Sequence, residues 1–313
     1  METGNENMEP STLAVFGVAG TVGELSKPIT KLIETVGAGV GAWYEPIGIR
    51  RRGRAEADVI EMTAHANAKA ADIAQRSAIR LENRERRRQR NIEKGARGAV
   101  EFLPGSVSDE PVDEDWVQKW MQGIEDVSNE RMQIIWSKIL AGETGKPGSF
   151  SQKTLSIMKT IDEPAANLFT KLCRFAWQLS DEKPQFFVPH VKSFAVSDGF
   201  MDFRILGTPD HALNEVSYAQ RLHLESLGLL KTDPSGLKIS GMLRPGTSET
   251  YYYHGQELRV WTEGQPRKLE FMVDLLTPAG NELFRICGAE HHIAFRDEFV
   301  AALRHQGLLV EWD

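Results

Sequence analysis

WVQKWMQGIEDVSNERMQIIWSKILAGETGKPGSFSQKTL, residues 116–155, is the stretch that decides the fold of the central part of the chain. Gly142 is expected to end a helix here, because glycine adopts the left-handed conformation at a helix C-terminus without steric cost. Lys146-Pro147-Gly148 then predicts a turn. The helix itself is predicted from apolar side chains that recur at helical spacing and form one broad face: Trp116, Trp120, Ile124, Val127, Ile134, Ile135, Ile139 and Leu140.

Beyond the turn, hydroxyl and carboxylate side chains stand where helix caps are needed. Ser149 or Ser151 is expected to cap a helix that begins near Lys153. Asp162, with Pro164 in the first turn, is expected to cap the next helix. A catalytic serine would need a base and an oxyanion hole, and no histidine or lysine accompanies these serines at a suitable spacing. We therefore predict a structural role for the segment and name no catalytic residue.

The same segment resembles an uncharacterised bacterial family of the domain-of-unknown-function kind. KLIETVGAGVGAWYEPIGIRRRGRAEA, residues 31–57, also resembles that family, so the resemblance covers most of the chain. Similar segments occur in Abi-alpha-type abortive-infection proteins, which implies a role in phage defence but supplies no reaction and no active site. The resemblance rests on an aromatic residue followed by L-A-G-E, P-G-S-F-S and T-L, here Trp136, Leu140, Ala141, Gly142, Glu143, Pro147, Gly148, Ser149, Phe150, Ser151, Thr154 and Leu155.

Upstream of this segment, residues 54–94 contain neither glycine nor proline and predict one long helix within a basic segment, 54–103. A stripe of small apolar residues ends at Leu81 and suits close packing against another helix, including one from a second subunit in a coiled coil. From Glu82 to Asn91 no apolar residue occurs. That part of the helix is therefore expected either to be solvated or to bind a charged surface.

The basic residues of this helix form a ridge. Residues 76–97 hold nine basic side chains against three glutamates, a local net charge of +6. Such a ridge is a candidate for phosphate groups of nucleic acid or lipid. The alternative is pairing within the protein, for which residues 109–130 offer eight acids against Lys119 alone. No aromatic residue lies between 65 and 101, so stacking of single-stranded bases is not supported. The candidate nucleic-acid or phosphate-binding residues are Arg76, Arg80, Arg84, Arg87 and Arg88.

The first segment, residues 1–53, is glycine-rich and is expected to be helical. Trp43 and Tyr44 beside Arg50, Arg51 and Arg52 are typical of an interfacial anchor, with rings at the headgroup level and cations toward phosphate. These five residues are candidates for contact with an anionic membrane surface or a protein partner. The alternative is a soluble helical hairpin whose small residues simply pack.

The C-terminal segment, residues 164–313, predicts an α+β domain that resembles a winged helix. A helix over 211–227 ends in L-x-x-L-G-L-L, strand-like runs follow, and Thr277-Pro278 starts another helix. The expected recognition helix holds Arg221 as its only arginine, against Glu215 and Glu225. A DNA-reading helix is normally basic, so we favour a structural or protein-binding role for this domain.

Composition limits the class of protein. The 313 residues suffice for more than one domain, and a net charge of -7 excludes a generally basic polyanion binder. Two cysteines indicate a reducing compartment, and the acidic start and the lack of 18 consecutive apolar residues indicate neither a secretory signal nor a membrane span. We expect a cytoplasmic protein, with peripheral contact at the inner membrane as an alternative, and no metal ion or cofactor.

Taken together, these patterns predict a mainly α fold with a long N-terminal helix and a C-terminal α+β winged-helix-like domain. The expected segments are 1–53, 54–103, an acidic linker with the central helical motif over 104–163, and 164–313. The leading function is that of a non-enzymatic, self-associating bacterial protein of phage defence or stress, which forms a homo-oligomer and contacts membrane or a protein partner through its N-terminal half. The alternatives are a nucleic-acid-binding winged-helix protein that uses the arginine-rich helix, and a cryptic nuclease.

Overall fold

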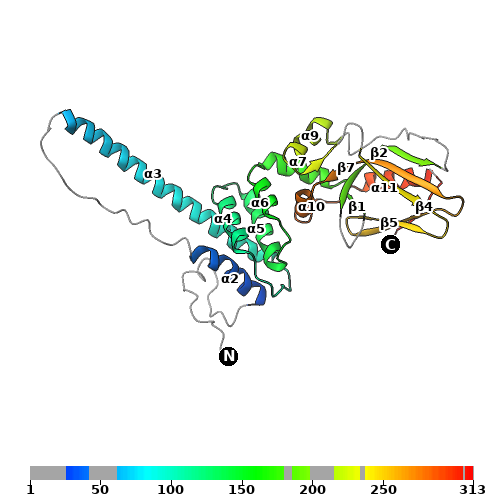
Figure 1. Ribbon diagram of the computed structural model, residues 1–313, viewed down its shortest axis with the longest axis horizontal. Helices are drawn as coiled ribbons and strands as arrows, with labels where there is room; N and C mark the ends of the chain where they lie inside the picture. Colours follow the sequence, from blue (N-terminus) through cyan, green and yellow to red (C-terminus); the bar gives the residue numbers. More distant parts are fainter. Residues whose placement is uncertain are drawn as a thin grey trace, which may run out of the picture. The chain divides into compact units, whose positions relative to one another are not determined.

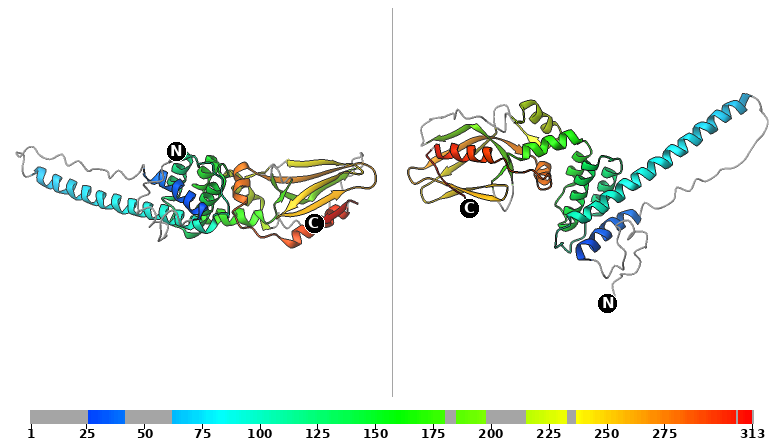
Figure 2. Two further views of the ribbon diagram at one scale, coloured as in Figure 1. Left: turned by 90° about the horizontal axis from the view of Figure 1, so that it is seen from below. Right: turned by 180° about the vertical axis from the view of Figure 1, so that it is seen from behind.

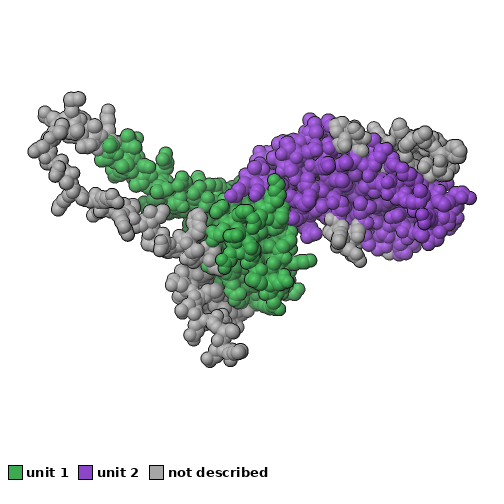
Figure 3. Space-filling view, viewed as in Figure 1, with its two compact units in different colours: residues 1–155 green, residues 156–313 purple. Residues whose placement is uncertain are grey.

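The computed structural model describes residues 26–41, 62–179, 185–197, 215–232, 237–305 and 307–312. The chain divides into two compact units, residues 1–155 and 156–313 (Figures 1 and 3). The first unit is helical where it is described, and the second is built around an antiparallel sheet. The predicted anchor residues Trp43, Tyr44, Arg50, Arg51 and Arg52 lie outside the described residues.

The first unit is a set of helices that pack around tryptophan side chains. Trp120 and Trp136 are fully buried, and the indole Nε1 of Trp120 donates to the carbonyl oxygen of Trp136 at 2.9 Å. The order of elements is α2 (Lys27–Gly41), α3 (Met62–Ala99), the 3-10 turn η2 (Val100–Phe102), α4 (Glu114–Ile124), α5 (Glu130–Gly145) and α6 (Gln152–Met158), of which α6 crosses into the second unit (Figure 1).

The central apolar stretch forms two helices, so the prediction of one helix from Trp116 to Gly142 is wrong. The chain leaves α4 after Ile124, and Asn129 caps the start of α5 by accepting from the backbone NH of Met132 at 3.1 Å. Gly142 does not end a helix, because α5 continues to Gly145. A Cβ at Gly142 would lie 2.6 Å from the Phe150 ring, so glycine is needed there for close approach. Gly148, at φ +83°, provides the left-handed turn instead.

The helix expected over 54–94 is not shown over that range. Its described part, α3, spans Met62–Ala99, and residues 54–61 lie outside the described part of the chain. The helix continues beyond Lys94 because Ala96 and Ala99 are fully buried against the first unit. Tertiary packing therefore sets its C-terminal limit, since helix stability in proteins comes mostly from a buried face.

The second unit has one antiparallel sheet with helices packed on it (Figure 2). The strand order is β3-β7-β2-β1-β5-β6-β8, and β4 pairs with β7 beside β3. Its elements are α7 (Glu163–Cys173), β1 (Trp177–Gln178), β2 (Phe186–Ser197), α9 (Tyr218–Ser226), β3 (Leu230–Lys231), β4 (Leu237–Leu243), β5 (Ser248–Tyr253), β6 (Gln256–Trp261), β7 (Arg267–Leu276), α10 (Pro278–Phe284), α11 (Ile293–His305) and β8 (Leu309–Trp312).

The predicted mainly α fold with a winged-helix-like domain is wrong. A wing is a short hairpin beside a helical bundle, whereas β7 here is a ten-residue strand that pairs with β2 on one edge and with β3 and β4 on the other. The sequence runs over β4 to β7 do form strands, and Thr277 caps α10 as expected. What differs is their pairing, because β2 lies between β7 and β1 and makes the strands one sheet.

The core of the second unit is aromatic. The Phe299 ring on α11 lies 4.2 Å from that of Trp177 and 6.5 Å from that of Tyr251, measured between centroids. Arg221 on α9 is buried, and its guanidinium lies 2.6 Å from the Asp274 carboxylate of β7. The only arginine of the predicted recognition helix is thus inside the protein, where it cannot contact DNA.

Candidate functional site

The strongest candidate for a binding surface is the part of α3 that no other described element covers. We call residues 70–90 of α3 the arm. From Ala70 to Arg84 every residue is exposed. Three large aliphatic side chains of the arm are open to water: Ile73 is 60% exposed, Ile79 51% and Leu81 45%. Ile73 and Leu81 lie on one side of the helix, and a contiguous exposed apolar face of this kind is a candidate contact surface.

The apolar residues of the arm continue the buried face of the same helix. Since α-helical residues advance by about 100° each, Ile73 and Leu81 point to the same side of α3 as Ile92 and Gly95. Ile92 is 6% exposed, and a Cβ on Gly95 would lie 2.1 Å from Cδ1 of Ile124 on α4. We call Ala70, Ile73, Ala74 and Leu81 the apolar stripe. One side of α3 is therefore packed at its C-terminal end and open along the arm.

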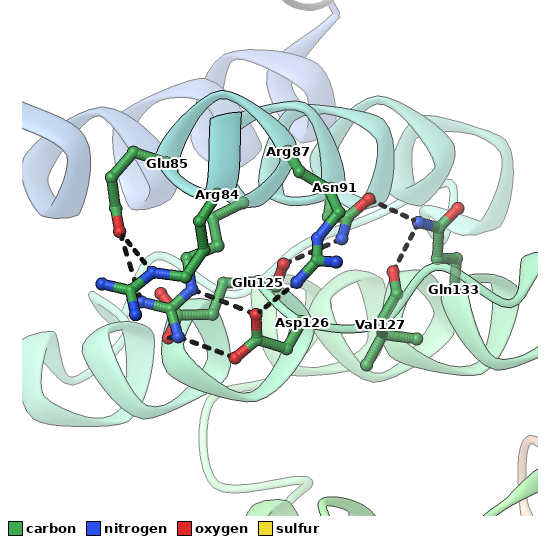
Figure 4. A network of polar contacts seen from close by, with 9 residues as sticks. Arg84, Glu85, Arg87, Asn91, Glu125, Asp126, Val127 and Gln133 are labelled. Atoms are coloured by element: carbon green, nitrogen blue, oxygen red, sulfur yellow. Dashed lines mark hydrogen bonds and ion pairs between the residues drawn. The ribbon is translucent and has the colours of Figure 1, made fainter. Parts of the chain in front are cut away.

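Polar contacts fix the C-terminal end of α3 on the loop between α4 and α5 (Figure 4). The Asn91 amide donates to the carbonyl oxygen of Glu125 at 2.8 Å. The Gln133 amide donates to Val127 O at 2.7 Å and to Asn91 Oδ1 at 3.3 Å. These bonds give partners to partly buried loop carbonyls, so they hold the helix in one register.

The Arg88 guanidinium binds the same loop. Its Nε and Nη2 donate to the two carboxylate oxygens of Asp126 at 3.0 and 2.8 Å, and Glu125 lies 3.5 Å away. The hydrogen bond from Arg88 lowers the pKa of Asp126, and the same bond raises the pKa of Arg88. Glu85, one turn earlier on α3, adds a contact at 3.6 Å. The Arg88 side chain is only 24% exposed, and its bonds hold α3 on this loop. We call the contacts of Arg87, Arg88, Asn91 and Gln133 with the α4–α5 loop the anchor.

The five arginines predicted to bind phosphate do not form one site. Arg87 and Arg88 reach Asp126, so part of the predicted internal pairing with the acidic segment is present. Arg76 pairs with Asp72 at 2.9 Å and Arg84 with Glu85 at 3.1 Å, both on α3 itself. Arg80 contacts no acid within the described part of the chain.

Two arginines of the arm were missed by the sequence reasoning. Arg86 and Arg90 line the same open groove as Arg76, Arg80, Arg84 and Arg87. For Arg90 a signal was present, because Arg76, Arg87 and Arg90 stand at i, i+11 and i+14, which is one side of a helix. Arg88, one of the five predicted residues, instead turns its side chain toward Asp126.

The central motif residues hold a turn together. The buried Glu143 carboxylate accepts from the backbone NH of Gly148 at 2.7 Å and from that of Phe150 at 2.8 Å. The Trp116 indole donates to Phe150 O at 2.6 Å. Ser151 caps α6 through the backbone NH of Thr154 at 3.2 Å, whereas the Ser149 hydroxyl donates to Lys146 O. Trp136 and Pro147 belong to the same unit.

The fold and this surface define a class of protein: a helical unit with an exposed arginine-bearing helix, followed by an antiparallel-sheet unit. The chain belongs to the family described as "Protein of unknown function (DUF2806)", whose model matches residues 75–303. No curated protein and no solved structure matches the chain.

Two further observations bear on the site. None of the helices in the described ranges is both long enough and apolar enough to cross a bilayer. Within the same residues, no group of three or more His, Cys, Asp or Glu side chains is arranged to hold a metal ion.

Proposed function

We propose that this protein is a non-enzymatic assembly protein whose copies associate through the arm of α3. The observation that carries the proposal is the uncovered apolar stripe. It continues a face that is already a packed helix interface at Ile92 and Gly95. A helix without packing on any side is marginal in water, and burial of its apolar face is the usual source of stability. Covering the exposed parts of Ile73 and Leu81 would contribute about 1–2 kcal/mol for each side chain.

A second copy of the chain is the occupant that the charges favour. Residues 64–74 carry only Lys69 and Asp72 as charged side chains, whereas residues 80–90 carry six arginines against Glu82 and Glu85. Two copies that run antiparallel place the neutral segment of one beside the arginine-rich segment of the other, whereas parallel copies would place the two arginine-rich segments side by side. Charges beside an apolar seam set orientation in coiled coils, so repulsion between like charges disfavours the parallel pair. The occupant proposed is therefore an antiparallel second arm.

The centre of this pairing falls near Ser77, which lies between Ile73 and Leu81 on the same side of the helix. With Ser77 at the twofold axis, Ile73 of one copy packs beside Leu81 of the other. Cysteine placed at 77 should then form a disulfide between copies under mild oxidation. Cysteine at Gln75, which points to the opposite side of α3, is the matched control and should not.

The test of association is the mass of the full-length protein in solution by light scattering after size exclusion. The wild type should show twice the chain mass of 35.1 kDa. Replacing Ile73 and Leu81 with glutamine keeps helix propensity and should give a monomer. Ile79→Gln removes an equally exposed aliphatic group from another side of the arm and should leave the dimer intact. A monomeric wild type, or equal loss from Ile79→Gln, would reject the proposal.

Phage defence is the biological context that we propose for this assembly, on the strength of the resemblance to Abi-alpha-type proteins. Cells that express the wild-type chain should give fewer phage plaques than cells that express the Ile73→Gln/Leu81→Gln variant. Equal plaque numbers at equal protein levels would show that assembly through the arm plays no part in defence.

Contact with a membrane or a protein partner through Trp43, Tyr44 and Arg50–Arg52 is a separate proposal that the sequence alone supports. Liposomes with anionic headgroups should float with the full chain, and replacement of the two aromatic residues by serine should reduce that fraction. Flotation that does not change would locate any membrane contact elsewhere.

A further inference from the structure

The arm has a second side that the apolar stripe does not use. Arg76, Arg80, Arg87 and Arg90 point within roughly 80° of one another, and Asn83 lies among them. They line one open groove along α3. With about 1.5 Å of rise per residue, the row from Arg76 to Arg90 is roughly 21 Å long. We call these four residues the arginine row.

The acids near the arginine row neutralise it only in part. Residues 70–90 hold seven arginines against Asp72, Glu82 and Glu85, a net charge of +4 in a chain whose total charge is -7. Arg76 pairs with Asp72 at 2.9 Å, Arg87 shares Asp126 with Arg88, and Glu82 pairs with Arg86. Arg80 contacts no acid among the residues that the structure describes, and the Arg90 guanidinium donates to the Arg86 carbonyl oxygen. The row therefore presents positive charge to the solvent.

The chemistry of the row favours phosphate. Every cation in it is a guanidinium, which matches a phosphate with two parallel NH donors better than an ammonium does. The charges lie in a line on a narrow rod, which suits the regular phosphates along a nucleic-acid backbone. No aromatic residue lies between 65 and 101, so unpaired bases would find nothing to stack on. This favours a duplex over a single strand.

A membrane surface is the weaker match. A helix that lies on a bilayer inserts an apolar side between its cationic flanks. The apolar stripe of the arm is already assigned to a second copy, so this step of the argument rests on the proposed function. Ile79 alone lies among the arginines, and one aliphatic side chain contributes too little buried surface for stable insertion.

We propose that the arginine row binds the phosphate backbone of double-stranded nucleic acid without reading its sequence. Two arms in an antiparallel pair present two rows, so one assembly contacts more phosphates than one chain. Contacts of this kind depend steeply on salt, with a slope of about -0.9 for each phosphate neutralised.

The experiment is fluorescence anisotropy of a labelled 20-base-pair duplex with full-length protein, repeated at several salt concentrations. The test variant replaces Arg76, Arg80 and Arg90 with glutamine, and it leaves Arg87 and Arg88 to hold the anchor. The control variant replaces Lys146, Lys153 and Lys159 with glutamine. These three are exposed cations outside α3, so the control removes the same charge. We expect the test variant to bind at least tenfold more weakly with a shallower salt slope, and the control to bind as the wild type does.

Three outcomes would overturn the proposal: wild-type protein that does not bind the duplex, equal binding by the test variant, and equal loss in the control variant. Binding to anionic vesicles in place of the duplex would assign the row to a membrane surface instead.

The proposals of arm pairing and of duplex binding can be rejected independently of each other. The test variant should remain a dimer by light scattering. The Ile73→Gln/Leu81→Gln variant should still bind the duplex as a monomer, with about half the salt slope, because each arm keeps its row.

Discussion

Arg88 and Asp126 form a two-point contact across 38 residues of sequence, with Nε on Oδ1 at 3.0 Å and Nη2 on Oδ2 at 2.8 Å. The contact fixes α3 at the level where its buried end gives way to the exposed arm. Two parallel bonds also fix orientation, which a single ammonium contact would not do. The direction in which the arm leaves the helical unit therefore depends on this pair together with the buried Asn91 and Gln133.

Loss of this contact should loosen the base of the arm. We expect Asp126→Asn to lower the free energy of unfolding by about 1 kcal/mol, because the pair is partly screened by water. Arg88→Lys should cost a similar amount despite the conserved charge. Arg80→Lys, which changes an arginine without an acidic partner in the described residues, is the control and should cost nothing. Urea unfolding followed by circular dichroism measures all three, and faster hydrogen exchange over residues 85–92 should accompany the first two.

The same pair predicts a pH effect. The hydrogen bond from Arg88 lowers the pKa of Asp126 in the folded protein. The stabilisation is therefore fully present above the pKa of an unfolded aspartate, about 3.9, and is lost as the pH falls through the lower folded value. Unfolding curves of the wild type and Asp126→Asn should converge below about pH 4. Curves that stay parallel into acid would show that the carboxylate does not contribute in this way.

Glu143 should be required for the turn after α5. Its buried carboxylate accepts two backbone NH groups, and hydrogen bonds to a charged acceptor contribute about 1.5–3 kcal/mol each. Glu143→Gln retains one acceptor oxygen but turns an NH2 group toward the second NH. We expect a loss of about 2–4 kcal/mol and a lower Tm by calorimetry. Ser149→Ala nearby removes one solvent-exposed hydrogen bond to Lys146 O and should cost about 1 kcal/mol or less, which separates the turn carboxylate from the serine.

Gly123 should not tolerate a side chain. An added Cβ would lie 2.1 Å from Cη2 of the buried Trp136 ring. Overpacking of this kind costs about 1–3 kcal/mol, because a rigid indole cannot move aside. Gly105→Ala is the matched control, since a Cβ at Gly105 meets nothing within 4 Å. Equal Tm values for the two variants would mean that the Trp136 ring has room to move away from α4.

The buried Arg221–Asp274 pair should hold α9 on the sheet. Removal of one partner leaves the other as an uncompensated buried charge, so Arg221→Met should cost about 3–5 kcal/mol. Combining it with Asp274→Leu should restore much of that loss. Denaturant unfolding of both single variants and the double variant gives the coupling energy directly. Simple additivity of the two single losses would show that the pair acts as two independent residues.

Local features of the fold were predictable because a few neighbouring residues decide them. Asp162 caps α7 and Thr277 caps α10, each by accepting from a backbone NH three residues later. Strand-like alternation in TYYY and ELRVW marked β5 and β6 correctly. The family resemblance rested on the turn motif around Glu143, and the chain does belong to a family of unknown function. A role in abortive infection remains a prediction.

The predictions that were wrong have one cause, which is that contacts between distant parts of the chain are not encoded locally. A winged helix and an antiparallel sheet can share the same run of strands, and only pairing separates them. Phe187 pairs with Leu275 across 88 residues, and no local pattern encodes that partner. Likewise the apolar face from Trp116 to Leu140 has helical spacing throughout. The break at Glu125–Asn129 brings Trp120 and Trp136 together, with the Trp120 indole donating to Trp136 O, and local spacing does not encode that contact.

The sequence by itself determined helix caps such as Asp162 and Thr277, strands such as β5 and β6, the arginine content of α3, and the small residues along one side of that helix. Tertiary structure decided which of those arginines are available. Arg88 and Arg90 are two residues apart and chemically identical, yet one is bound to Asp126 and the other lines an open groove. The physical reason is that a helix distributes its residues around an axis, and only the elements packed against it determine which side faces water.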